Sequence, residues 1–280
     1  MSARLEGIAA ITFDFGNTLV PIGRTALQRV VERTADAIAE RIPGIDRGAL
    51  LTAWGEERDR QFREEVPQLR EVDLRERMIR VFARLKGMPP PPAEGRWDQP
   101  RATELADPGD VEWAVDRYRG AFVAGLTATP GVAALLGRLA IDRDLAILSN
   151  WPLASMIDRF AEAEGWTAHL RAIIVSERVG TIKPHPAMFA AARQALGNPE
   201  PAAILHVGDD WAADVVGAKA AGWRTAWLRS RPEDTPLPSS ERDWSVQADL
   251  ELESLGDLEA CLAAPSTSDR DPRRGDGPAR

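Results

Sequence analysis

Cysteine, lysine, tyrosine and long hydrophobic runs are all scarce in this chain of 280 residues. Cys261 is the one cysteine, so an internal disulfide is excluded, and no cysteine and histidine cluster has zinc-site spacing. This cysteine usage favours a cytoplasmic protein. No apolar run approaches the length of a membrane span or of a signal-peptide core, so we expect no membrane partner.

Basic residues are also fewer than acidic residues. The chain has 35 Lys and Arg against 43 Asp and Glu, which gives a formal net charge of -8. A nucleic-acid partner held through its phosphates would need a basic surface, so this balance argues against one. Hydrophobic residues make up 44% of the chain, enough for a substantial core. We therefore expect a monomer or homodimer that acts on a small molecule.

Short apolar runs ended by turn residues indicate buried strands. The predicted strands are Ile8–Phe13, Leu145–Leu148, Ala172–Val175, Ala203–Val207 and Arg224–Leu228. Helical patterns separate the later strands, and such alternation is typical of a parallel sheet with helices on both faces. The sequence thus predicts an α/β fold with a Rossmann-like core.

A long helical stretch interrupts this core after its first strand. Helical spacing recurs between residues 24 and 123, apart from the proline-rich loop at 87–100, which we expect to be neither helix nor central strand. We therefore predict a core domain of residues 1–19 and 128–264 and a helical cap domain of residues 20–127. Residues 265–280 lack large apolar side chains, which predicts a disordered tail.

Polar side chains follow most of the predicted strands. Ligands of open parallel sheets bind outside the carboxyl ends of the strands, so these side chains are the candidate site. They are Asp14, Ser149, Asn150, Lys183, Asp209, Asp210 and Asp214. Clustered carboxylates repel one another unless a hard cation such as Mg²⁺ joins them, and such a cation also binds phosphate. A carboxylate beside it can attack phosphorus to form an acyl phosphate.

The chain resembles the haloacid dehalogenase-like hydrolase superfamily. The motifs that carry the resemblance are "DFGNTL", "LSN", "IKPHPAMF" and "VGDDWAADVVGAKAAGW", in the family's order. Each motif alone is weak, but their joint occurrence after successive strands is specific. The place of the insertion, between the first two motifs, is similar to the helical cap of the first cap class. The resemblance implies a Mg²⁺-dependent hydrolase of a small phosphorylated metabolite.

The resemblance also implies a role for each matched residue. Asp14 corresponds to the nucleophile, and Lys183 positions the nucleophile and the phosphate. The implied phosphate-binding residues are Thr18, Ser149, Asn150 and Lys183. The implied metal ligands are Asp14, the backbone carbonyl of Gly16, Asp209 and, as a supporting carboxylate, Asp214.

Gly16 departs from the family pattern. Family phosphatases usually carry a second Asp there, which acts as general acid and base, and such groups are typically worth about 10²–10⁴-fold in rate. One interpretation is a phosphatase that favours good leaving groups or takes its acid from the cap. Another is a phosphate-binding or partner-binding protein with little turnover. Dehalogenase chemistry fits less well because Asp209 and Asp214 are kept, and phosphonatase chemistry because Lys86 is the one lysine of the insertion.

Other polar residues have simpler interpretations. Asp210 and His185 are predicted to cap helices, and His206 to be a satisfied core residue, since it lies within an apolar strand. Arg24, Trp54, Arg58 and Arg63 could face an anionic substrate, although a solvated charged helix face is the commoner explanation for such residues.

Overall fold

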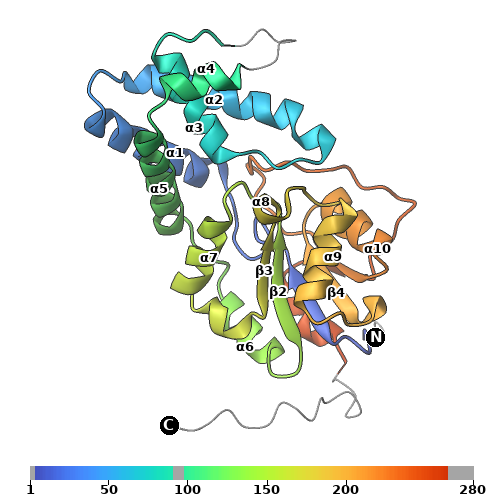
Figure 1. The fold of residues 1–280 in the computed structure, drawn as a ribbon. Helices are drawn as coiled ribbons and strands as arrows, with labels where there is room; N and C mark the ends of the chain where they lie inside the picture. The colour runs from blue at the N-terminus through green and yellow to red at the C-terminus, as the bar shows by residue number, and fades with distance from the viewer. Residues whose placement is uncertain (1–3, 91–97, 264–280) are drawn as a thin grey trace.

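A six-stranded parallel sheet forms the centre of the molecule (Figure 1). The computed structural model describes residues 4–90 and 98–263, so the predicted disordered tail at 265–280 lies outside the described residues. The strands are β1 (Ala10–Phe13), β2 (Asp144–Ser149), β3 (Ala172–Val175), β4 (Ile204–Gly208), β5 (Arg224–Leu228) and β6 (Leu250–Leu252). Their order is β3-β2-β1-β4-β5-β6, with every neighbouring pair parallel. The predicted α/β fold is confirmed.

The first strand lies inside the sheet, between β2 and β4. All four of its residues are buried, which is why it reads as a continuous apolar run. In register, Phe13 faces Ile147 of β2 and Val207 of β4. The residue that follows each of these strands therefore emerges at the same edge. The sixth strand was not predicted, because it has three residues and its central Glu251 is exposed.

Helices cover both faces of the sheet. One face packs against α6 (Val132–Leu139) and α7 (Ala154–Ala163), the other against α9 (Pro186–Ala195) and α10 (Gly217–Ala220) (Figure 1). Alternate strand residues supply the two cores: Ile147 belongs to the first cluster, Ala146 and Leu148 to the second. A short helix, α8 (Ser176–Val179), follows β3 directly.

Five further helices lie between β1 and β2 in the sequence and gather at one end of the sheet (Figure 1). They are α1 (Arg24–Arg41), α2 (Arg47–Glu64), α3 (Leu74–Leu85), α4 (Gln99–Leu105) and α5 (Pro108–Gly125), and we call them the helical insertion. Aspartates cap four of them by accepting backbone hydrogen bonds: Asp46, Asp73, Asp98 and Asp107. The division into a core domain and a cap domain at residues 20 and 127 stays a prediction.

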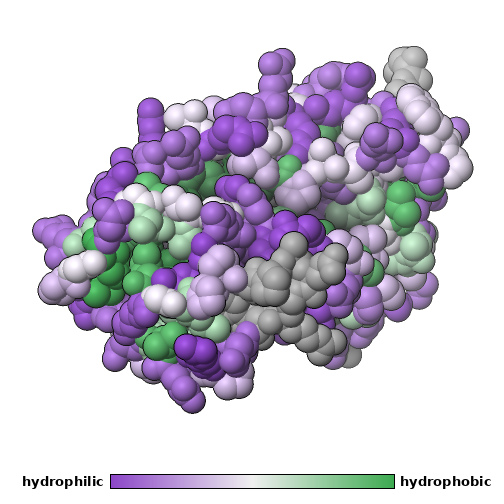
Figure 2. Space-filling view, turned by 90° about the horizontal axis from the view of Figure 1, so that it is seen from above, coloured by the Kyte–Doolittle hydropathy of each residue, from purple (hydrophilic) through white to green (hydrophobic). Residues whose placement is uncertain are grey.

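The proline-rich stretch at 87–100 only partly matches its prediction. Residues 91–97 lie outside the described residues, but Gln99 and Pro100 form the first turn of α4. A proline is tolerated there because the first turn needs no intrahelical N–H donor. Seen from above, the surface is mainly hydrophilic with small hydrophobic areas (Figure 2). Within residues 4–90 and 98–263, no helix has the length and apolar character that a membrane span requires.

Candidate active site

The side chains predicted at the strand ends meet around Lys183. Its ammonium group is 2.8 Å from Asp14 Oδ1 and 2.6 Å from Asp214 Oδ1, and it also donates to the carbonyl oxygen of Leu148 at 2.8 Å. Burial opposes the charged form of Lys183, but the two carboxylates more than offset this and raise its pKa. Lys183 therefore stays charged and holds Asp14 in place.

Both carboxylate oxygens of Asp214 have hydrogen-bond partners. Its Oδ1 also lies 3.0 Å from His206 Nε2, and its Oδ2 accepts the backbone N–H of Asp210 at 2.9 Å. Burial would raise the pKa of Asp214, but Lys183 and His206 outweigh it, and the net pKa is lowered. The carboxyl also explains Gly208, because a Cβ there would lie 2.2 Å from the Asp214 carboxyl group. Asp214 is thus an ionised anchor.

The predictions for three other polar residues are confirmed. His206 is buried in β4 and lies 2.8 Å from Thr12 Oγ1, so both of its ring nitrogens have partners. Asp210 accepts the backbone N–H of Ala213, and His185 that of Ala187, each at the start of a helix.

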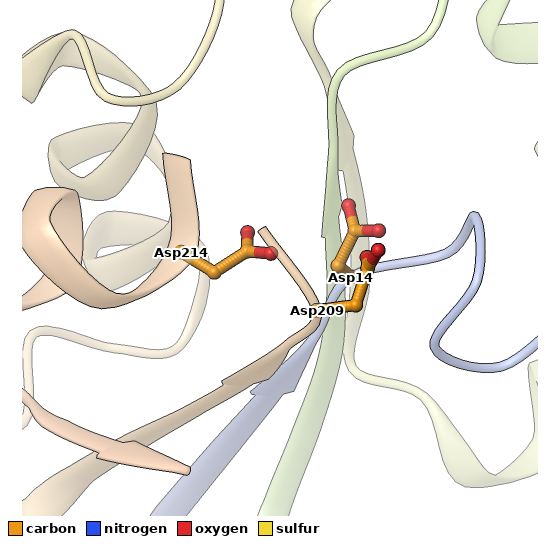
Figure 3. A group of neighbouring side chains, drawn as sticks. All are labelled: Asp14, Asp209 and Asp214. Carbon is orange, nitrogen blue, oxygen red and sulfur yellow. The ribbon is translucent and has the colours of Figure 1, made fainter. Parts of the chain in front are cut away.

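Asp209 carries an unfavourable charge in this setting. Burial, followed by the neighbouring carboxylates of Asp14 and Asp214, raises its pKa to about 8. Figure 3 shows the Asp14 and Asp209 carboxyl groups side by side, with the Asp214 carboxyl pointing toward them. One carboxylate oxygen from each of the three lies within 4.8 Å of the others. Three oxygen donors that repel one another fit a hard divalent cation, which would relieve that repulsion.

The turn after β2 is tied to Lys183. The side-chain oxygen of Asn150 accepts the backbone N–H of Lys183 at 2.7 Å, and its amide donates to the Lys183 carbonyl at 3.1 Å. Ser149 is buried at the end of β2. The Thr18 hydroxyl donates to Asp209 Oδ1 at the long distance of 3.5 Å. Lys183 and Thr18 thus contact the carboxylates, and Ser149 and Asn150 line the cavity beside them, while the role of all four in phosphate binding stays a prediction.

Gly16 lies against an apolar side chain. A Cβ built on Gly16 would be 2.7 Å from Leu237 Cδ1 and 3.4 Å from the Trp151 ring. A side chain at Gly16 would therefore require the flexible Leu237 side chain to move. The next residue, Asn17, has a φ of 59°, the left-handed conformation that asparagine tolerates better than most residues.

The loop between β5 and β6 contributes residues that the sequence did not reveal. Arg231 Nη1 is 3.0 Å from Asp209 Oδ2, and Thr235 exchanges hydrogen bonds with the Asn17 side chain. Ser240 bonds the Asp210 carboxylate through both its backbone N–H and its hydroxyl. This loop has no motif, so only the fold could show that it reaches the site.

A cavity of about 620 Å³ opens above the carboxylates and is lined by both the core and the helical insertion. Of the insertion residues singled out from the sequence, Arg24, Trp54 and Arg58 line it, whereas Arg63 is not among the lining residues. The cavity is also lined by Glu71, Arg77 and Tyr118, which no sequence motif marks. Arg77 lies on the buried face of α3, and a charged residue at an apolar position of the helical repeat is the signal that could have found it.

Glu71 joins the helical insertion to the core. Its carboxylate accepts a hydrogen bond from the Ser176 hydroxyl, which itself accepts the Trp151 N–H at 2.8 Å. Close by, the Leu69 carbonyl accepts from the Thr181 hydroxyl at 2.6 Å and from the backbone of Ile182. Burial raises the pKa of Glu71 to about 7. The insertion therefore contacts the segment that leads into Lys183.

Comparisons with known proteins agree on one protein family. A sequence model of haloacid dehalogenase-like hydrolases matches residues 8–222. The pyrimidine 5'-nucleotidase YjjG of Escherichia coli is 29% identical over 161 residues, which are 58% of this chain and 69% of that protein.

Solved structures share the fold over nearly the whole chain. The HAD-hydrolase YfnB from Bacillus subtilis, solved bound to magnesium, superposes with a TM-score of 0.59 at 19% identity and covers 92% of this chain and 99% of its own. A 2-haloacid dehalogenase from Pseudomonas syringae gives a TM-score of 0.58 at 22% identity, over 91% of this chain and 97% of its own. At such identities the likeness concerns the fold alone.

Proposed function

The chain belongs to the haloacid dehalogenase-like hydrolases, and we propose that it hydrolyses a small phosphorylated compound with Asp14 as nucleophile and Mg²⁺ as cofactor. The observation that carries the proposal is the placement of Asp14. Its carboxyl is buried, 2.8 Å from Lys183 Nζ, and borders the cavity beside Asp209 and Asp214. The similarity to a nucleotidase favours phosphate ester hydrolysis over dehalogenation.

The reaction proceeds in two displacements. An Asp14 carboxylate oxygen attacks phosphorus, the bond from phosphorus to the leaving oxygen breaks, and that oxygen departs with the electron pair. Water then attacks the phosphorus of the aspartyl phosphate, which releases inorganic phosphate and a proton and restores the carboxylate. Lys183 orients Asp14 and neutralises charge on the phosphate oxygens. Ser149, Asn150 and Thr18 hold the phosphate at the strand ends.

Asp14, Asp209 and the Gly16 carbonyl would hold Mg²⁺, with Asp214 as supporting carboxylate. When bound, Mg²⁺ supplies positive charge that offsets the repulsion between the carboxylates and the phosphate. We assign the helical insertion to the first cap class, because it lies between the strands that carry Asp14 and Ser149.

The leaving group is restricted by Gly16. No side chain at this position can donate a proton, and Leu237 occupies the adjoining space. An alkoxide leaves poorly without protonation, whereas a carboxylate or a phenolate leaves unaided. We therefore propose acyl phosphates or aryl phosphates as the preferred substrates, with alkyl esters slower by about 10²–10⁴-fold.

A second candidate is a phosphate-binding protein with little turnover. Two contacts favour it: Leu237 at the acid position and the ion pair between Arg231 and the proposed metal ligand Asp209. Both would reduce catalysis without closing the cavity.

The test is a panel of acyl, aryl and alkyl phosphates with and without Mg²⁺. We expect Mg²⁺-dependent turnover of the first two classes and none in Asp14→Asn. The double variant Gly16→Asp with Leu237→Ala should gain alkyl phosphatase activity, while the control Leu237→Ala alone should not. Absence of metal-dependent turnover on all three classes would contradict the hydrolase proposal and favour the binding-protein alternative.

A further inference from the structure

Arg77 is a buried cation that has no carboxylate partner within the described parts of the chain. It is 5% exposed, and its Nε donates to Gln61 Oε1 at 2.8 Å. No ion pair joins it to any acidic residue within 4–90 and 98–263. Burial lowers the pKa of Arg77 to about 10, so the guanidinium remains charged at neutral pH. A buried charge that forms no direct ion pair is unfavourable, and natural proteins usually keep one for a purpose.

The other buried arginines of the helical insertion are paired. Arg60 lies 2.8 Å from Glu57 and 2.6 Å from Glu64, and Arg80 forms an ion pair with Glu76. Neither Arg60 nor Arg80 is among the residues that line the cavity, whereas Arg77 is. Among the buried arginines of the helical insertion, the one without an ion pair is therefore the one that borders the candidate active site.

The surroundings of Arg77 indicate the kind of group that would bind there. Trp54 and Tyr118 stack with ring centroids 5.2 Å apart, and the Arg77 guanidinium lies 5.9 Å from the Trp54 ring. All three line the same wall of the cavity, together with apolar residues such as Leu51 and Phe62. Glu71 lines the cavity too and interacts electrostatically with Arg77, but it forms no direct ion pair with Arg77 and already accepts hydrogen bonds from Ser176 and Val72.

We propose that Arg77 determines specificity by binding an anionic oxygen group, a carboxylate or a second phosphate, on the part of the substrate that lies against Trp54 and Tyr118. The inference rests on the proposed function for the position of the reacting phosphate. An arginine fork matches the planar geometry of a carboxylate and can donate two parallel hydrogen bonds to it. The substrate is thus a phosphorylated compound with an apolar or flat body and an acidic group distant from the phosphate.

Three inert probes test the proposal by calorimetric binding to the intact protein. They are 4-carboxybenzylphosphonate, its analogue 4-carbamoylbenzylphosphonate, in which a neutral carboxamide replaces the carboxylate, and xylylene bisphosphonate. The wild type should bind one of the two doubly anionic probes about 10- to 100-fold more tightly than the carboxamide, as expected for charge-assisted hydrogen bonds. The tighter of the two identifies the acidic group as carboxylate or phosphate.

Variants assign the discrimination to Arg77. Arg77→Gln should abolish the preference, and Arg77→Lys, which keeps the charge without the fork, should retain only part of it. Arg80→Gln is the matched control, because Arg80 lies on the same helix and is equally buried but does not line the cavity. Its preference should equal that of the wild type. Circular dichroism checks that each variant is folded.

Equal binding of all three probes to the wild type, or no binding, would overturn the inference without any variant. So would a preference that survives in Arg77→Gln. Turnover of phenyl phosphate, which carries no acidic group, separately tests the proposed function. If the protein hydrolyses phenyl phosphate with Mg²⁺ but does not discriminate between the probes, the proposed role of Arg77 is contradicted and the proposed function is not.

Discussion

Two groups of buried charges occupy the two halves of this molecule. At the strand ends, Lys183 is shared by Asp14 and Asp214, and Asp209 is paired with Arg231. In the helical insertion, Arg60 is shared by Glu57 and Glu64, and Glu57 also contacts Arg84 at 3.3 Å. The first group has an excess of carboxylates and borders a cavity, whereas the second is not part of the cavity lining.

The contrast between the two groups separates a chemical site from a structural one. Burial alone does not separate them, since Glu57 is as buried as Asp214. Charge balance does: an excess of one sign at a cavity wall indicates a ligand of the other sign. By the same rule, Arg77 belongs with the site although it lies in the insertion.

The largest effect that this comparison predicts concerns Lys183. Lys183→Met leaves Asp14 and Asp214 without their shared cation, so kcat/KM for an aryl phosphate should fall by at least about 10³-fold. Steady-state kinetics with saturating Mg²⁺ measures it. Lys219→Met is the control, because Lys219 pairs with Asp249 away from the cavity and its loss should leave the rate unchanged. If both variants lose a comparable share of kcat/KM, the charges at the strand ends have no greater catalytic importance than other ion pairs.

The next largest effect concerns the helical insertion, where substitutions should change the free energy of unfolding rather than the reaction rate. Glu57→Leu leaves Arg60 and Arg84 without a buried counter-charge and should lower the free energy of unfolding by about 3–5 kcal/mol. Arg77→Met, which removes a charge with no carboxylate partner, should cost less than half of that. Urea unfolding at pH 7 measures both. If the two variants lose equal stability, charge balance does not distinguish structural from ligand-binding charges.

The sequence predicted the core better than the insertion for a physical reason. Asp14 and Lys183 follow apolar strands, and a parallel sheet brings all strand ends to one edge, so their meeting follows from the order of elements alone. Glu57 and Arg77 lie on helices whose charges look alike in the sequence. Which of them is buried depends on helix packing, and Arg231 and Leu237 reach the site through a loop without a motif.

Magnesium should stabilise the folded protein through the carboxylates at the strand ends, independently of the charges in the helical insertion. At 100 times its dissociation constant, a ligand that binds only the folded state stabilises it by about 2.7 kcal/mol. Thermal unfolding with and without MgCl₂ should show that gain in the wild type and in Glu57→Gln. Asp209→Asn, which lacks one of the three clustered carboxylates, should show little of it. A full gain in Asp209→Asn would place the ion elsewhere.

The smallest effect lies where the two halves meet, at Glu71. Burial raises its pKa from the ordinary 4.5 to about 7, so the folded protein binds a proton more tightly than the unfolded chain does. The contribution of this group to the free energy of unfolding is therefore fully present below pH 4.5 and is lost as the pH rises from 4.5 to 7.

Relative to Glu71→Gln, which cannot ionise, the wild type should lose roughly 2–3 kcal/mol of unfolding free energy between pH 4.5 and pH 8. Taking the difference between the two proteins at each pH removes the contributions of all other titrating groups. A difference that stays constant with pH would show that the carboxyl has the same pKa in the folded protein as in the unfolded chain.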